Sequence, residues 1–476
     1  MPSTTAEFRQ QEIEMSEIQL NIALEKKSNL LRKALADGKF VFLAECRIPE
    51  DERTLDAAAA RVLPLAEKMW SIDDLYGGLA ILDCPDAPFS PVEFASVLPE
   101  EFRNRNCFYI SGSGKTLEDI ERELTVAAAN GIENLVAVSG NAWGENVKMC
   151  RARNYTGTIR ILEAMKRADS FRPGATVNPF QYRAETMLGT LGYLRKKLLA
   201  GAEFNIIQSG WDMLQNQNLS WYMLRNGIYI PQIVRITFLS PEKIENIIAG
   251  KIPGITICKE FRKQLEQELC GSSAQFEAAQ YRRLELQVAG ARLMGASGVQ
   301  ISGVNYPGKA EIIARRIRSA LEEFKDFNHW LDEYHRYQAE AEMSTSIRTF
   351  RLYDRILRRD YPFDEPPSGK DAEIQPLSKR ERFNRKVCKL LFSNADRQRA
   401  GRDRLLKKIF ASCRSCRKCT LPQHHFVCVE NCPKHLQHGP CGGVREDGRC
   451  EIGNFECVHV KIVRFSSHEK SGFDLE

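Results

Sequence analysis

Residues 116–141 read TLEDIERELTVAAANGIENLVAVSGN and join a helix-like pattern to a short apolar run. Thr116, with Glu118 and Asp119 close behind it, has the features of a helix N-cap with acidic residues in the first turn. The short run from Asn134 to Ser139 is typical of a buried strand. A helix followed by a strand is the repeating unit of α/β folds, so this stretch predicts that fold class.

The same alternation of short apolar runs and longer helical patterns extends from about residue 39 to residue 325. Eight such runs predict a (β/α)8 TIM barrel, and an open doubly wound sheet is the structural alternative. The predicted strands are Phe40 to Cys46, Leu75 to Asp83, Asn106 to Ser111, Asn134 to Ser139, Gly174 to Asn178, Phe204 to Gln208, Ile230 to Ile236 and Gly298 to Ser302. In a barrel, the chemistry lies where strands end and loops begin.

Polar residues at the predicted strand ends are therefore the candidate site residues: Glu45, Asp83, Asn141, Asn178, Gln208 and Asn305. Glu45 directly follows FVFLA, so strand alternation places it inside the barrel mouth. Desolvation there would raise its pKa towards that of a general acid. Gln208 closes the apolar run FNII, and its neutral amide is suited to fixing a planar heterocycle by paired donor and acceptor bonds. The alternative is a solvent-facing loop position for Glu45 and a rim amide for Gln208.

A phosphate-loop motif is excluded at residues 111–116, which read SGSGKT. The full motif needs glycine six positions before the lysine, and Tyr109 stands there. Helix capping by Thr116 explains the stretch better than nucleotide hydrolysis does.

Residues 413–457 hold eight of the fifteen cysteines, which is enough for two complete sets of four. Four thiolates are what a tetrahedral zinc ion or an iron–sulfur cubane requires. Three thiols within seven residues favour [4Fe–4S] clusters, zinc is the alternative, and disulfides or free thiols are a third interpretation. The candidate ligands are Cys413, Cys416, Cys419, Cys428, Cys432, Cys441, Cys450 and Cys457.

Length and charge set further bounds. A chain of 476 residues exceeds the size of a single core, so two or three domains are expected. No apolar run approaches the length of a membrane span, and no signal peptide is recognised, so we expect a cytoplasmic protein.

Residues 343–412 hold 18 Lys and Arg against 9 Asp and Glu. This basic run lacks interleaved aromatic residues, which argues against nucleic-acid binding and favours a solvated helical face or one docked on an acidic partner.

Three segments resemble methylenetetrahydrofolate reductases. Residues 116–141 are similar to the helix and fourth strand of that family, including the Asn-Gly-Ile link, and residues 191–212 are similar to its sixth-strand region. The sequences CPKHLQHGPCGG and DGRCE are similar to a cysteine-rich module that is attached to or partnered with such reductases in some bacteria. The resemblance covers residues from about 38 to 325 and from about 385 to 465.

The resemblance implies an oxidoreductase acting on CH–NH donors, which reduces 5,10-methylenetetrahydrofolate to 5-methyltetrahydrofolate with a flavin. Glu45 matches the acid that protonates N10 and opens the five-membered ring to an iminium. Gln208 matches a glutamine that contacts the pterin or its partner ring. Lys197 matches a flavin-contacting lysine, and Asn141 stands where the family has an aspartate near the flavin pyrimidine. The expected cofactor-binding residues are Asp83, Asn141, Asn178 and Lys197.

Two departures from the family weaken the expectation of FAD. The strand-four turn, Arg-Gly-Asp in many members, reads Ser139-Gly140-Asn141, and a family aspartate before strand six is Thr190 here. Replacing an aspartate by asparagine should raise the potential of a nearby flavin. FMN, or a folate-binding barrel without flavin, is therefore an alternative.

The electron donor depends on the metal. Iron–sulfur clusters would favour ferredoxin or a partner subunit, whereas zinc would leave the module structural and NAD(P)H as the donor. Two other functions stay open: a flavin-independent folate-binding methyl or one-carbon transferase, and a metal-bearing subunit of a larger complex. The expected organisation is an N-terminal helical extension (1–37), the barrel (38–330), a basic linker (331–384) and the cysteine-rich domain (385–476), with an oligomer also considered.

Overall fold

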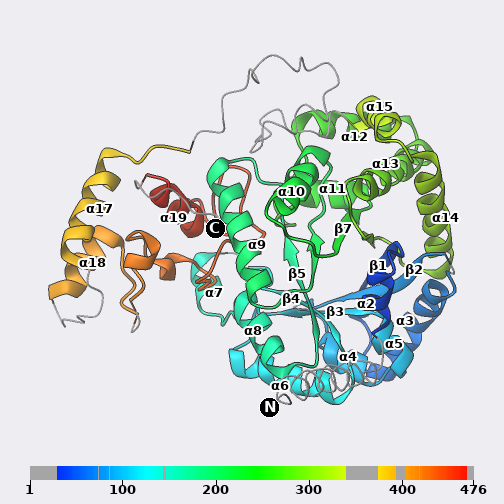
Figure 1. Cartoon of the computed structure of the whole chain (residues 1–476), viewed down its shortest axis with the longest axis horizontal. Helices are drawn as coiled ribbons and strands as arrows, with labels where there is room; N and C mark the ends of the chain where they lie inside the picture. The colour runs from blue at the N-terminus through cyan, green and yellow to red at the C-terminus, as the bar shows by residue number, and fades with distance from the viewer. Residues whose placement is uncertain are drawn as a thin grey trace, which may run out of the picture.

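The computed structural model describes residues 29–72, 74–84, 86–142, 146–338, 374–392, 402–416 and 419–468. Eight parallel strands close into a barrel in chain order (Figure 1), which confirms the predicted TIM barrel and excludes the open sheet. The strands are β1 (Val41–Arg47), β2 (Tyr76–Leu82), β3 (Cys107–Ser111), β4 (Asn134–Val138), β5 (Arg172–Val177), β6 (Phe204–Ile207), β7 (Gln232–Thr237) and β8 (Gly298–Ser302).

Helices surround the barrel, and among the described residues a short helix precedes it. The preceding helix is α2 (Leu30–Ala36), and the others are α3 (Leu55–Trp70), α4 (Pro91–Ser96), α5 (Glu100–Arg105), α6 (Leu117–Ala129), α7 (Val147–Arg151), α8 (Thr158–Ala168), α9 (Ala184–Leu199), α10 (Met213–Arg225), α11 (Pro241–Ile248), α12 (Lys259–Gly271), α13 (Ser273–Leu293), α14 (Pro307–Glu323) and α15 (Phe327–Gln338). The predicted cap of α6 is confirmed, because the Thr116 hydroxyl accepts from the Asp119 N–H and the Asp119 carboxylate accepts from the Thr116 N–H.

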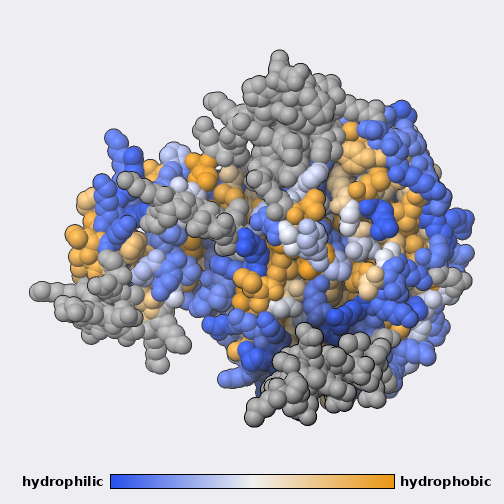
Figure 2. All heavy atoms as spheres, in the orientation of Figure 1, coloured by the Kyte–Doolittle hydropathy of each residue, from blue (hydrophilic) through white to orange (hydrophobic). Residues whose placement is uncertain are grey.

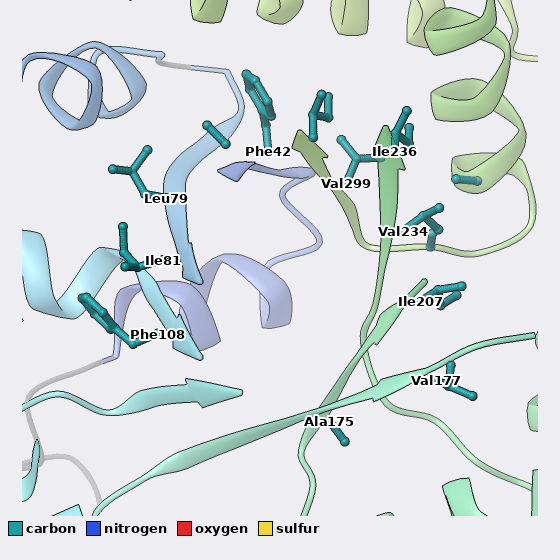
Figure 3. Packing of buried hydrophobic residues seen from close by; sticks show 14 of the residues in the cluster. Phe42, Leu79, Ile81, Phe108, Ala175, Val177, Ile207, Val234, Ile236 and Val299 are labelled. Atoms are coloured by element: carbon teal, nitrogen blue, oxygen red, sulfur yellow. The ribbon is translucent and has the colours of Figure 1, made fainter. Parts of the chain in front are cut away.

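Strand alternation separates two apolar layers. Side chains such as Phe42 and Val299 face outward and pack under the helices (Figure 3), whereas Val41 and Leu43 belong to a separate buried cluster inside the barrel. Leu31 of α2 joins the inner cluster, so this helix covers one end of the barrel interior. The inward series along each strand therefore determines which polar residues reach the barrel mouth.

The cysteine-rich module lies beside α7 and α9 (Figure 1) and contains little regular structure between its helices. Its elements are α17 (Lys379–Phe392), α18 (Arg402–Ala411), the 3-10 turns η2 (Pro422–His424) and η3 (Val429–Asn431), and α19 (Val458–Ser466). Helix α19 packs on α9, where Gly189 leaves room for Val463. Residues 1–28 and 339–373, which include most of the predicted extension and linker, lie outside the described residues.

Helices α17 and α18 expose apolar side chains beside their lysines and arginines. Figure 2 shows apolar residues on this outer side of the module. The exposed apolar residues are Phe383, Leu390, Leu391, Leu405 and Ile409. Across the segments that the structure describes, every helix is too short or too polar to span a membrane.

Candidate functional site

Five polar side chains form one hydrogen-bonded chain at the carboxyl-terminal mouth of the barrel. Arg235 of β7 donates to both carboxylate oxygens of Glu45, with Nε–Oε2 and Nη2–Oε1 distances of 2.5 and 2.8 Å. Its third nitrogen, Nη1, donates to Oε1 of Gln208 at 2.9 Å. On the other side, Gln300 donates to Glu45 at 3.1 Å and accepts from the Tyr109 hydroxyl at 2.8 Å. The two predicted catalytic residues, Glu45 and Gln208, are thus brought together through one arginine.

The strands explain this convergence. Glu45 continues the inward series of Val41 and Leu43, and Arg235 continues that of Ile233, another member of the inner cluster. Because β1 and β7 both flank β8, their inward side chains point to the same end of the interior. Only 9% of the Glu45 side-chain surface is exposed to solvent.

The ionisation of Glu45 differs from the expectation. Burial raises its pKa, as predicted, but the positive charge of Arg235 and hydrogen bonds from Arg235 and Gln300 lower it more. The net pKa lies below the ordinary value of 4.5, so the expected rise is wrong while Arg235 bonds the carboxylate. With Arg235 in this position, Glu45 is a carboxylate at neutral pH.

Sequence reasoning missed Arg235, Gln300 and Tyr109. The sequence did contain a signal for the arginine. QIVRIT has one charged residue among apolar and uncharged ones, at a position that faces the barrel interior. Lys243 of α11 adds a second cation near the mouth, where burial lowers its pKa and the charge of Glu45 opposes that shift. Its Nζ lies 3.5 Å from the Ser302 hydroxyl at the end of β8.

Asp83 is held at the ends of β2 and β3. Its Oδ2 accepts from the Ser111 N–H and from Lys115 Nζ, both at 2.8 Å, and Lys115 also pairs with Glu123. Asp83, one of the expected cofactor-binding residues, therefore has one carboxylate oxygen that already accepts from two protein donors.

Asn178, Lys197 and Asn141 lie where the barrel meets the cysteine-rich module. The Asn178 amide donates to the carbonyls of Gly254 and Gly442, each at 2.9 Å. Lys197 is buried, donates to the Thr176 carbonyl and stands over the Tyr193 ring, and burial lowers its pKa to about 7. Asn141 is exposed.

These contacts test the expected flavin site. Three of its four residues, Asp83, Asn178 and Lys197, have polar groups bonded to protein, and Asn178 bonds the module itself. The residues as arranged do not fit a flavin site, and we derive no step through a flavin from them.

The eight cysteines of the module fall into two neighbourhoods. One holds Cys432, Cys441, Cys450 and Cys457, which line a single small cavity. The second neighbourhood holds Cys413, Cys416, Cys419 and Cys428. The charges of Cys413, Cys419 and Cys428 each raise the pKa of Cys416, which indicates that the four thiols lie close together. The structure describes all fifteen cysteines, and none of them is in a disulfide.

The donor chemistry of both groups fits a thiolate-bound metal, although the sulfur atoms are not gathered around a common centre. Among the described residues, no three Cys, His, Asp or Glu side chains are placed so as to hold a metal ion. Burial raises the pKa of Cys432 to about 11 and that of Cys441 to about 12, so without a cation these thiols are neutral. A bound metal would supply the charge that stabilises the thiolates.

Lys434 connects the module to the turn after β4. Its buried Nζ pairs with Glu451 and donates to the Gly140 carbonyl at 2.9 Å. Gly140 belongs to the turn Ser139-Gly140-Asn141, whose sequence departs from the reductase pattern. The module is thus attached directly to a loop at the carboxyl-terminal end of the barrel.

Residues 392–473 match the protein-family model described as "Methylene-tetrahydrofolate reductase C terminal". This match confirms the predicted resemblance of the cysteine-rich module. Together with the closed barrel, it fits a methylenetetrahydrofolate reductase-like barrel followed by its C-terminal module. No curated protein gives a significant sequence match to the chain.

Solved structures share only low identity with the chain. An uncharacterized protein from Clostridium thermocellum, described as binding two copies of 5-methyl-5,6,7,8-tetrahydrofolic acid, is 15% identical with a TM-score of 0.46, covering 61% of this chain and 98% of its own. A putative dihydrodipicolinate synthetase from Pseudomonas aeruginosa is 13% identical with a TM-score of 0.33, covering 67% and 84%. A 2,3-dimethylmalate lyase of the PEP mutase/isocitrate lyase superfamily is 12% identical with a TM-score of 0.33, covering 61% and 84%. We draw no functional inference from these likenesses.

Proposed function

We propose that the chain binds a reduced folate at the mouth of its barrel and reduces 5,10-methylenetetrahydrofolate to 5-methyltetrahydrofolate. The observation that supports this most directly is the contact of Glu45 and Gln208 with one arginine on the inner barrel wall. The family match of the C-terminal module points to the same area of metabolism.

The polar chain suits a pteridine ring. The pyrimidine edge of a reduced pteridine presents N–H donors beside a carbonyl acceptor. Arg235 offers donors to this edge and the Gln208 amide offers both a donor and an acceptor, which leaves Glu45 for N10. Few but well-placed polar groups on an otherwise apolar wall are typical of small-molecule sites.

The proton required at N10 must come from a protonated Glu45, which its contact with Arg235 opposes. A folate carbonyl or carboxylate that accepts the Arg235 hydrogen bonds would leave burial as the main influence on Glu45. Burial raises its pKa, so substrate binding would favour the acid form. Protonation of N10 then opens the ring to the electrophilic iminium. A nicotinamide, when bound, would supply the hydride to the iminium carbon.

A second candidate is a folate-dependent methyl or one-carbon transferase that needs no flavin. The observation that favours it is that Asp83, Asn178 and Lys197 are engaged by protein groups. Such a barrel would still bind the folate through Glu45 and Gln208.

We also propose that the two cysteine groups hold metal, with [4Fe–4S] preferred to zinc. Iron would open a route for electrons from ferredoxin or a partner subunit, whereas zinc would leave NAD(P)H as the donor. Iron, zinc and acid-labile sulfide analysis of protein purified without oxygen decides between them. Stoichiometric zinc without iron would rule out the electron route.

The central test is Glu45→Gln in the full chain, with Glu133→Gln as the matched control. Glu133 bonds Asn29, which precedes α2 at the opposite end of the barrel, so its replacement should leave folate chemistry unchanged. We expect Glu45→Gln to abolish folate reduction while folate binding persists. Unchanged turnover in Glu45→Gln would refute the proton-donor role. A colourless protein that binds folate but does not reduce it would favour the transferase.

A further inference from the structure

A cavity of about 470 Å³ lies between α17, α18, α19 and the barrel helix α7. Small-molecule sites have volumes of roughly 300 to 1,000 Å³, so the cavity is large enough for an organic ligand. Its lining belongs mainly to the cysteine-rich module and includes no residue of the polar chain at the barrel mouth. It is therefore a separate place for a ligand.

One end of the cavity holds two guanidinium groups side by side. Arg151 donates from Nη2 to the backbone carbonyl of Asn431, and Arg414 donates from Nε to the side-chain oxygen of the same residue, each at 2.8 Å. Both guanidinium groups therefore lie against the same residue, Asn431. The Arg151 Nε is buried and has no hydrogen-bond partner in the described part of the chain.

The acids of the cavity do not neutralise this end. Glu381 and Glu456, the two carboxylates in the lining, both pair with Arg464 at 2.7 to 2.8 Å. Arg464 is itself buried outside the lining. Among the described residues, neither Arg151 nor Arg414 forms an ion pair with an acidic side chain, and two adjacent planar guanidinium groups suit a phosphate.

Aromatic side chains contribute to the lining of the cavity. Phe410, Phe426 and Phe455 line it from three different segments of the module. Flat apolar rings of this kind pack well against a planar heterocycle. Cys428, a member of one four-cysteine group, lies in the same wall.

We propose that this cavity binds a phosphate-bearing ring compound of mononucleotide size, with its phosphate between Arg151 and Arg414 and its ring against the phenylalanines. A flavin mononucleotide and an adenine mononucleotide share this chemistry. The ligand would lie beside the four-cysteine group that includes Cys428. The proposal is independent of folate reduction in the barrel.

The test is titration calorimetry of the full chain with FMN, AMP and inorganic phosphate as separate probes. We expect at least one nucleotide to bind, and phosphate to bind more weakly because it lacks the ring. Arg151→Gln and Arg414→Gln should each weaken nucleotide binding about tenfold or more, since each removes a charged hydrogen-bond donor. Arg318→Gln, a surface change on α14, is the matched control and should have no effect.

Other results overturn the proposal. They are the absence of binding by both nucleotides, affinity unchanged by both arginine replacements, or phosphate binding as tightly as the nucleotides. Binding that is lost in Arg235→Met but kept in Arg414→Gln would place the ligand in the barrel instead. Arg414 is exposed, so circular dichroism should show that its replacement leaves the fold intact.

Discussion

Replacing Arg235 by methionine should reverse the pH dependence that Glu45 gives to barrel stability. The change removes the two hydrogen bonds at 2.5 and 2.8 Å and leaves Glu45 with the single bond from Gln300 at 3.1 Å. Breaking a buried ion pair costs about 3 to 5 kcal/mol. We expect the unfolding free energy to fall by about 3 kcal/mol at pH 7, the lower end of this range, because Gln300 still donates a hydrogen bond to the carboxylate.

The direction of this pH dependence follows from the difference between the folded and unfolded pKa values of Glu45. In the native chain the folded pKa of Glu45 is lowered, so its stabilisation is present above the unfolded pKa and is lost as the pH falls through the folded pKa. Without Arg235, burial alone raises the folded pKa above the unfolded one. At low pH the buried Glu45 of the variant is protonated and neutral, so it does not destabilise the barrel. The variant then loses unfolding free energy as the pH rises from about 4.5 towards neutrality and Glu45 ionises.

Urea unfolding followed by tryptophan fluorescence measures this effect, because all five tryptophans lie in the barrel part of the sequence. Arg318→Met is the matched control: Arg318 makes the same two-bond contact with Asp74, at 2.6 and 2.7 Å, but the side chains are 42% and 50% exposed. A surface pair of this kind contributes about 0 to 1 kcal/mol. The double variant Glu45→Gln/Arg235→Met should recover stability and lose the pH dependence. A pH profile of Arg235→Met parallel to the native one would refute the reasoning.

Three further predictions concern the module. Lys434→Met leaves a buried carboxylate unpaired and should cost about 3 to 5 kcal/mol, seen as faster proteolysis of the module; native-like resistance would contradict it. Asn178→Ala removes two hydrogen bonds between barrel, loop and module and should cost about 1 to 3 kcal/mol in urea, whereas exposed Asn141→Ala should cost under about 0.5. Equal losses in the two variants would argue against the bridging role. Cys441→Ser and Cys416→Ser should each remove about half of the bound metal if the cysteines form two sets. Complete loss in either variant would mean a single centre.

The barrel was predictable because its signal is local. Each strand shows as a short apolar run, and each helix as a longer periodic pattern, so all eight strands were located within about two residues. The helix cap at Thr116 was predictable for the same reason, since Asp119 stands only three residues away. The inward position of Glu45 followed from alternation along one strand.

The ionisation of Glu45 was not predictable in this way. Its partner Arg235 is 190 residues distant in the chain, and only barrel closure brings the two strands to either side of β8. Asn178 was assigned to a cofactor because it stands at a strand end, and Lys197 because it matches a flavin-contacting lysine of the reductase family. In the folded chain Asn178 instead bonds Gly442 of the module, and Lys197 bonds the Thr176 carbonyl of β5.

Periodicity and composition are properties of neighbouring residues, and they were enough to predict the barrel, the strand-end residues that face its interior and a segment with eight thiols. Which charge faces Glu45, which amides join barrel to module and which cysteines lie together could be read only from the folded chain. Those contacts arise between distant segments, and their electrostatic effect depends on burial that exists only once the chain has folded.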